Sequence, residues 1–187
     1  MMNYDKLIAL IETLGVHPEL GPVGQGWDIE QNPHELTTFL AALPEIHTVL
    51  EIGTGYKAGL ARFMSQHLGW QVTSVDVTDY GHAYPGIEFM VNPDPRIFQA
   101  REYDLVIIDG DHAYEAVKAD YELYGSRARS GAGIVMFHDI AGLRDCDGAA
   151  RFWRELSYTK KGVLRQGFHE AIADGPQRAG IGWIQHA

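Results

Sequence analysis

The chain contains little cysteine and few basic residues, and these shortages exclude several kinds of site. It has one cysteine, Cys146, among 187 residues, so no disulfide can form within the chain and no cysteine-based zinc cage is possible. Its 15 Lys and Arg residues stand against 25 Asp and Glu residues, which gives a formal net charge of −10. Such a charge argues against a general electrostatic grip on nucleic acid or on an anionic membrane surface.

Long apolar runs are also absent. No run reaches the roughly 18 residues that a bilayer-spanning helix needs, and the first residues lack the basic start and apolar stretch of a signal peptide. A single cysteine suits a reducing compartment, so we expect a cytoplasmic protein. The remaining composition, 45% hydrophobic and 21% charged, is ordinary for a globular protein, and the length predicts one domain over residues 1–187.

Short apolar runs alternate with segments of helical periodicity along most of the chain. Near-continuous apolar strands that alternate with helices are typical of a parallel sheet covered on both faces. We therefore predict an α/β fold with a Rossmann-like, doubly wound, mostly parallel sheet of seven strands and a C-terminal antiparallel hairpin. An N-terminal helical segment, residues 1–45, should pack on this sheet. The expected strands cover residues 48–52, 71–75, 87–91, 105–108, 134–137, 163–171 and 181–184, and the expected helices cover 4–14, 32–43, 58–68, 114–124 and 149–156.

A glycine turn follows the first expected strand, and an acidic residue follows the second. Gly53 and Gly55 permit a sharp turn and a close approach of the backbone to a ligand. Asp76 lies 21 residues after Gly55, at the end of the next strand, where a carboxylate accepts hydrogen bonds from ribose hydroxyls. Together, the two features predict a cofactor that contains adenosine.

The type of cofactor depends on Glu51. Residues 53–58 formally fit the dinucleotide pattern G-x-G-x-x-G/A, which leaves an NAD-dependent oxidoreductase as one alternative. Glu51, however, stands at the strand end two residues before the first glycine, where a carboxylate would face a pyrophosphate unfavourably. This residue suits a cofactor with a cationic, amino-bearing end.

Two clusters of acids and histidines follow two further apolar runs. Asp109, Asp111 and His112 come after the fourth expected strand, and His138 and Asp139 come after the fifth. In open α/β sheets, ligands bind outside the carboxyl ends of the strands. Oxygen and nitrogen atoms at two such ends can hold a divalent metal ion or supply acid–base chemistry.

The glycine turn and its acids resemble those of a known family. The sequence Glu51-Ile-Gly-Thr-Gly after an apolar strand, with Asp76 following, is similar to the first motif and the ribose acid of class I S-adenosylmethionine-dependent methyltransferases. The resemblance implies that the cofactor is S-adenosylmethionine. The residues that it assigns to cofactor binding are Glu51, Gly53, Gly55, Asp76 and Asp109.

The later clusters resemble a narrower group within that family. The pattern Ile-Asp-Gly-Asp-His-x-Tyr-Glu-x-Val-x-x-Asp at residues 108–120, followed by Gly-Ile-x-x-x-His-Asp at 133–139, is similar to the small O-methyltransferase-like group. This group includes macrocin-type and caffeoyl-CoA-type O-methyltransferases and the related cephalosporin hydroxylase proteins. Gln-x-Pro-x-Glu-Leu at residues 31–36 and Gly-Ile-Gly-Trp at 180–183 also fit, so the resemblance covers roughly residues 30–185.

Similarity to the caffeoyl-CoA-type enzymes implies that Asp109 is a metal ligand and that His138 and Asp139 supply further ligands, for Mg²⁺ or Mn²⁺. The family pair at the end of the fifth strand is often Asp-Asn or Glu-Asp, and an imidazole at His138 favours Mn²⁺, Fe²⁺ or Zn²⁺ over Mg²⁺.

His112 stands where relatives have a lysine proposed as catalytic base, and an imidazole titrates near neutral pH. Lys57 is a departure from a usually small residue; it can reach the cofactor's carboxylate or crowd the loop.

The sequence therefore predicts methyl transfer from S-adenosylmethionine to a hydroxyl of a small molecule, with His112 and Asp109 as catalytic residues and a divalent metal assisting. A hydroxylase-like reaction, a non-catalytic cofactor-binding protein and, less favoured, the NAD-dependent oxidoreductase remain alternatives. Each site residue also has a structural alternative, as a helix cap for Asp109 and Asp139 and as a packed side chain for His112 and His138.

The sequence also gives expectations for the acceptor contacts and for the oligomeric state. The acceptor contacts should come from variable loops at residues 15–31, 80–86 and 141–150, which do not specify a substrate. Relatives of this size often pair to complete their sites, so a homodimer is one expected arrangement.

Overall fold

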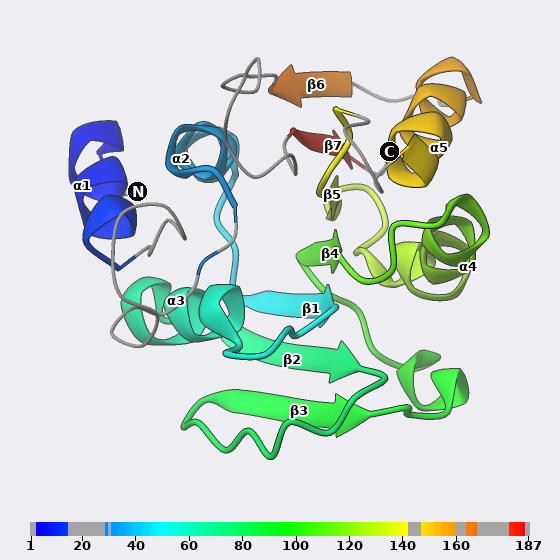
Figure 1. Cartoon of the computed structure of the whole chain (residues 1–187), viewed down its shortest axis with the longest axis horizontal. Coiled ribbons are helices and arrows are strands. Elements are labelled where there is room, and N and C mark those ends of the chain that lie inside the picture. The colour runs from blue at the N-terminus through cyan, green and yellow to red at the C-terminus, as the bar shows by residue number, and fades with distance from the viewer. Residues whose placement is uncertain are drawn as a thin grey trace.

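The fold centres on one seven-stranded sheet (Figure 1). The computed structural model describes residues 3–14, 29, 31–141, 147–159, 164–167 and 180–185. The strand order is β3-β2-β1-β4-β5-β7-β6, in which the first five strands are parallel and β7 is antiparallel to both β5 and β6. The strands are β1 (Thr48–Ile52), β2 (Gln71–Asp76), β3 (Ile87–Val91), β4 (Leu105–Ile108), β5 (Ile134–Phe137), β6 (Leu164–Gly167) and β7 (Ile181–Gln185). The predicted α/β class, mostly parallel sheet and antiparallel C-terminal strand pair are confirmed.

Helices cover both faces of this sheet. They are α1 (Tyr4–Leu14), α2 (Pro33–Ala42), α3 (Gly59–Leu68), α4 (Tyr114–Tyr124) and α5 (Asp147–Thr159), with short 3₁₀ turns η1 (Pro95–Phe98) and η2 (Gly125–Arg127). In Figure 1, α1, α2 and α3 lie on one side of the strands, and α4 and α5 lie on the other. Among the described residues, none of the helices is both long and apolar enough to cross a membrane.

Alternate residues of each central strand pack into two separate cores. On the α1–α3 face, Val49 of β1 and Ile107 of β4 are buried together with Phe39 and Phe63. On the α4–α5 face, the neighbouring strand residues are buried against Val117, Phe152 and Trp153. The alternation follows from the two-residue period of a strand, and burial on both faces explains why these strands are almost entirely apolar.

Capping side chains and backbone conformation determine where helices α2 and α3 begin. At α2, Pro33 occupies the first turn and the Asn32 side chain accepts hydrogen bonds from the backbone N–H groups of His34 and Glu35. Helix α3 begins one residue later than predicted, because Ala58 adopts a left-handed conformation with φ 51°. Of the predicted strand 163–171, residues 164–167 form β6, and residues 163 and 168–171 lie outside the described part of the chain.

The register brings the carboxyl ends of four strands to one edge. Ile52 of β1 pairs with Val75 of β2 and with Ile108 of β4, which in turn pairs with Phe137 of β5. The residues that follow these positions are those singled out in the sequence. The fold therefore gathers the glycine turn, the acid after β2 and both charged clusters at one edge of the sheet.

Candidate active site

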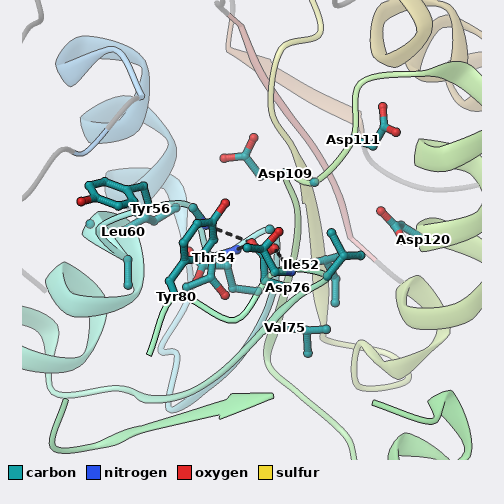
Figure 2. Close-up of a pocket in the computed structure, with 18 of the residues that line it drawn as sticks. Ile52, Thr54, Tyr56, Leu60, Val75, Asp76, Tyr80, Asp109, Asp111 and Asp120 are labelled. Carbon is teal, nitrogen blue, oxygen red and sulfur yellow. Dashed lines mark hydrogen bonds between the residues drawn. The ribbon is translucent and has the colours of Figure 1, made fainter. Parts of the chain in front are cut away.

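A cavity of about 790 Å³ opens at this edge of the sheet. Its volume is within the range of pockets that hold a ligand of cofactor size. Its described lining comprises Gln31, residues 51–60, residues 75–78, Tyr80, Asn92, Pro93, residues 109–112, Ala116, Asp120 and Tyr124. In Figure 2, Tyr56 and Leu60 lie on one side of the cavity, Asp111 and Asp120 lie on the opposite side, and Asp76 lies between them.

Position 53 requires glycine for two reasons, its backbone conformation and the atoms that lie next to it. Its φ is +96°, and a Cβ added there would lie 2.0 Å from the carbonyl oxygen of Asp109. Its backbone N–H donates to the carbonyl of Val75 at 2.8 Å. The first glycine thus lets the turn after β1 lie directly against the residue that ends β4. Gly55 also has a positive φ, +68°, but a Cβ there would meet no atom within 4 Å.

Asp76 holds the glycine turn in place. One carboxylate oxygen accepts hydrogen bonds from the backbone N–H groups of Thr54 (2.9 Å) and Gly55 (3.1 Å), and the other accepts from Thr78 N–H (2.8 Å) (Figure 2). The carboxylate also lines the cavity. The predicted ribose contact remains a prediction, and the structure adds a positioning role that no sequence motif indicated.

Glu51 lies buried at the inner wall of the cavity. Its carboxyl accepts a short hydrogen bond from the Ser74 hydroxyl, which is 2.7 Å from the Thr54 hydroxyl. Burial raises the pKa of Glu51 to about 8, helped by the nearby charges of Asp109 and Asp76 and opposed by the Ser74 hydrogen bond. The residue is therefore mostly protonated at neutral pH without a ligand. A cationic group placed beside it would favour its ionised form.

This buried carboxyl gives a testable dependence of stability on pH. Below about pH 4.5, Glu51 is protonated in both the folded and the unfolded chain. Between that pH and about 8, only the folded chain keeps the proton, so stability falls as pH rises, and above pH 8 the cost reaches roughly 5 kcal/mol. We expect Glu51→Gln to match the wild type in unfolding free energy near pH 5 and to exceed it by several kcal/mol at pH 8.5. Urea unfolding of both proteins at both pH values measures this difference, and parallel pH profiles would contradict the assignment.

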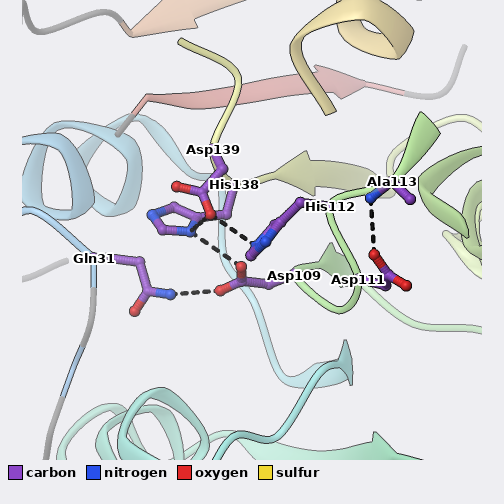
Figure 3. A network of polar contacts seen from close by, with 7 residues as sticks. All are labelled: Gln31, Asp109, Asp111, His112, Ala113, His138 and Asp139. Carbon is purple, nitrogen blue, oxygen red and sulfur yellow. Dashed lines mark hydrogen bonds and ion pairs between the residues drawn. The ribbon is translucent and has the colours of Figure 1, made fainter. Parts of the chain in front are cut away.

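A network of carboxylates and imidazoles joins the ends of β4 and β5 (Figure 3). One oxygen of Asp109 lies 3.0 Å from His138 Nδ1, and the other accepts a 2.6 Å hydrogen bond from Gln31 Nε2. His138 is buried. Burial alone would lower the pKa of His138, but the carboxylates of Asp109 and Asp139 raise it well above its usual value.

Asp139 connects the two histidines. One of its oxygens lies 2.8 Å from His112 Nε2 and 3.4 Å from His138 Nδ1. The residue is fully buried and has a left-handed φ of 59°, which is uncommon outside glycine. Burial alone would raise the pKa of Asp139, but its contacts with His112 and His138 outweigh this and lower the pKa.

The start of α5 fixes the backbone around His112. Ala149 N–H donates to the carbonyl of His112 at 3.1 Å. A Cβ added to Gly148 would lie 2.4 Å from that carbonyl oxygen and 2.2 Å from Tyr114 N, so glycine allows the close contact. His112 is thus held by the α5 terminus through its backbone and by Asp139 through its ring.

The structure brings the predicted residues Asp109, His112, His138 and Asp139 together. It does not place Asp111 in this network, because Asp111 accepts a hydrogen bond from Ala113 N–H at 2.8 Å in the turn before α4 (Figure 3). No role for Gln31 was predicted from the sequence. Its place in the Gln-x-Pro-x-Glu-Leu motif was the one feature of the sequence that indicated a functional role for it.

The loops considered for the acceptor are described only in part. Tyr80 lines the cavity, and its ring lies 6.0 Å from that of Tyr56, which is 74% exposed. Residues 15–28, 30 and 142–146, including Cys146, lie outside the described residues. The acceptor contacts predicted for these ranges remain predictions.

Comparison with known proteins adds a family and a fold. The family model described as a methyltransferase domain matches residues 28–140. No curated protein matches the sequence. A candidate caffeoyl-CoA O-methyltransferase from Staphylococcus aureus has a similar structure, with a TM-score of 0.60 and 14% identity over 100% of this chain and 93% of its own.

Two further solved structures share the architecture. A candidate O-methyltransferase from Nostoc punctiforme matches with a TM-score of 0.56 and 14% identity, over 98% of this chain and 68% of its own. An O-methyltransferase family protein from Burkholderia thailandensis matches with a TM-score of 0.53 and 11% identity, over 98% of this chain and 58% of its own. At these identities the structures show a common fold.

Proposed function

The chain belongs to the methyltransferase-domain family, and on that basis we propose that it transfers the methyl group of S-adenosylmethionine to a hydroxyl of a small molecule. One observation carries the proposal. The cavity extends from the glycine turn and Asp76 to Asp109 and His112, which belong to the acid–histidine network. A cofactor held by the turn would therefore lie beside groups that can act on an acceptor hydroxyl.

His112 is the candidate base. Its Nε2 faces the carboxylate of Asp139, which orients the ring and stabilises its protonated form. The acceptor's proton would pass to Nδ1, the nitrogen that does not face Asp139. The acceptor oxygen then bonds to the methyl carbon as the carbon–sulfur bond breaks, and S-adenosylhomocysteine leaves with the electron pair on sulfur. The sulfonium loses its positive charge in this step, so no external reductant or oxidant is needed.

The residues present also fit a divalent metal ion. Asp109, His138 and Asp139 each offer one ligand atom, and these atoms lie within 4.8 Å of one another. Nε2 of His138 and Oδ1 of Asp139 are buried and make no hydrogen bond to a described residue. A metal ion held there would supply a positive charge that lowers the pKa of an acceptor hydroxyl. The nitrogen ligand favours Mn²⁺ over Mg²⁺.

Removal of the metal tests this part of the proposal. Excess chelator should lower the rate of methyl transfer at least about tenfold, and Mn²⁺ should restore it. In calorimetry, Asp139→Ala should abolish Mn²⁺ binding, while Asp111→Asn, outside the cluster, should retain it. Full activity of protein that elemental analysis shows to be metal-free would exclude the metal and leave His112 as the base.

Transfer of label tests the function itself. S-adenosylmethionine that carries an isotopically labelled methyl is incubated with the protein and a panel of small hydroxyl compounds, including catechols. We expect label on an acceptor oxygen and release of S-adenosylhomocysteine. Cofactor binding without label in any acceptor would favour a non-catalytic or hydroxylase-like protein, and preferential binding of NAD would favour the oxidoreductase.

A further inference from the structure

The start of α2 contributes two buried polar side chains to the edge of the sheet where the site lies. Gln31 directly precedes Asn32, the N-cap of α2, and Glu35 lies in the first turn of the helix. Gln31 is 5% exposed and Glu35 is 4% exposed. Burial of a polar side chain is costly unless it is hydrogen-bonded, so the partners of these two residues indicate what they hold in place.

Gln31 holds one oxygen of the Asp109 carboxylate. Its Nε2 donates to that oxygen at 2.6 Å, and the other oxygen of Asp109 lies 3.0 Å from His138 Nδ1 (Figure 3). The orientation of the Gln31 amide follows from this contact, because an ionised carboxylate only accepts hydrogen bonds and the amide must present its NH₂ group to it. A carboxylate rotates easily about its last side-chain bond, and contacts at both oxygens restrict that rotation.

Glu35 reaches Asp139 through the backbone of a third segment. Its carboxylate accepts a 2.8 Å hydrogen bond from the N–H of Gly180, which lies 145 residues later in the chain. The carbonyl of Gly180 in turn accepts from the N–H of Ile140, the residue after Asp139, at 3.2 Å. Gly180 has a φ of +95°, and a Cβ there would lie 3.0 Å from the backbone nitrogen of Ala141, so glycine allows this close approach. The chain directly after Asp139, whose left-handed φ is 59°, is thus tied to α2.

Both contacts lead to residues that can hold the metal ion. Asp109 and Asp139 belong, with His138, to the group whose ligand atoms lie within 4.8 Å of one another. Groups that hydrogen-bond a metal ligand fix its orientation, and their loss typically lowers metal affinity about ten- to a hundredfold. Gln31 contacts its ligand directly, whereas Glu35 acts through two backbone hydrogen bonds, so Gln31 should have the larger effect.

We infer that Gln31 and Glu35 are positioning residues, which hold Asp109 and Asp139 in the arrangement that binds a divalent cation. The inference rests on the metal ion of the proposed function and adds to it the residues that set the affinity for that ion. It also gives a role to the motif at residues 31–36, which the proposed reaction leaves without one.

Calorimetry of the whole protein with MnCl₂ tests the role of Gln31. Gln31→Met keeps the length of the side chain but removes the donor, so it should weaken Mn²⁺ binding by about ten- to a hundredfold. The affinity for S-adenosylhomocysteine should be retained, because the contacts of Asp76 with the glycine turn are unchanged. Gln71→Met makes the same change at the exposed first residue of β2, at the end of the strand away from the site, and should alter neither affinity.

Two variants of Glu35 test the indirect contact. Glu35→Gln keeps an oxygen that can accept from the Gly180 N–H, so it should retain most of the Mn²⁺ affinity. Glu35→Met removes that acceptor and should weaken Mn²⁺ binding by about tenfold. Rescue by glutamine alone assigns the effect to the hydrogen bond with Gly180.

Methyl-transfer assays separate the affinity for the ion from the chemical step. The Mn²⁺ concentration that gives half of the maximal rate should rise in Gln31→Met by the factor that calorimetry measures. The rate at saturating Mn²⁺ should return close to the wild-type rate, because the ligands Asp109, His138 and Asp139 are all still present.

Unchanged Mn²⁺ affinity in Gln31→Met overturns the inference, and so does an equal loss of Mn²⁺ and S-adenosylhomocysteine binding, which would indicate a general disturbance of the cavity. In both cases the proposed function stands. A wild-type protein that transfers methyl groups but binds no Mn²⁺ overturns the inference together with the metal ion. A wild-type protein that binds Mn²⁺ but transfers no methyl group overturns the proposed function, while the Mn²⁺ comparison still decides the inference. If Gln31→Met does not fold, Gln31→Asn, whose shorter side chain withdraws the donor, replaces it.

Discussion

Replacing His112 with alanine should lower kcat by about 10²- to 10⁴-fold, the usual contribution of a positioned general base. The affinity for S-adenosylhomocysteine should change little, because the glycine turn and Asp76 remain intact. Steady-state assays of labelled methyl transfer give kcat, and calorimetry gives the affinity for S-adenosylhomocysteine. A loss confined to kcat would place His112 in the chemical step.

Two further variants refine this result. Asp139→Asn keeps the shape of the residue that faces His112 Nε2 but removes its charge, so it should lower kcat by a smaller factor and shift the pH profile. His47→Ala should leave kcat unchanged, because this side chain is largely exposed and His47 precedes β1, at the opposite end of the strands from the network. An active His112→Ala protein would assign the base to another group and leave His112 as a packing residue.

Replacing Gly53 with alanine should have the largest effect on the fold of the site. A Cβ there would overlap the backbone carbonyl of Asp109, which no side-chain rotation can relieve, and the φ of +96° is strained for any L-residue. We expect a loss on the order of 3 kcal/mol or more in unfolding free energy and loss of measurable S-adenosylhomocysteine binding. Urea unfolding and calorimetry measure the two effects.

Gly55 offers the matched control. Its φ is also positive, but a Cβ there would meet nothing within 4 Å, so Gly55→Ala should cost only the conformational strain, on the order of 1 kcal/mol. A similar cost for the two variants would show that conformation alone, and not the contact with Asp109, makes Gly53 necessary. A stable Gly53→Ala protein with normal ligand affinity would contradict the described turn.

The sequence predicted the fold and the neighbourhood of the site because both depend on local patterns. Apolar runs at β4 and β5 indicated parallel strands buried on both faces, and parallel strands end at a common edge. That rule alone brought Asp109 near Asp139. The glycine spacing and Asp76 located the cofactor end of the cavity for the same reason.

The sequence could not predict the partners of these residues, because they depend on contacts between distant segments. The hydrogen bond from Gln31 to Asp109 joins positions 78 residues apart. The pairing of His112 with Asp139 depends on the left-handed backbone at Asp139 and on the close packing of Gly148. The protonated state of Glu51 arises from burial, which no motif encodes.

These contacts change how the two charged clusters are understood. As sequence motifs they offered a metal site formed by Asp109, His138 and Asp139 and a separate base at His112. In the structure, Asp139 contacts both histidines, and Asp109 contacts His138. A substitution at Asp139 should therefore affect metal binding and base function together, whereas a substitution at His112 should spare metal binding.

The methyl donor should span the cavity, with its ribose beside Asp76 and its sulfur facing His112. A crystal structure of the protein with S-adenosylhomocysteine tests this most directly. We expect density across the cavity, with the ribose near Asp76 and the sulfur on the side of Asp109 and His112. A ligand bound in the reverse direction, with adenine against His112, or bound outside this cavity, would contradict it.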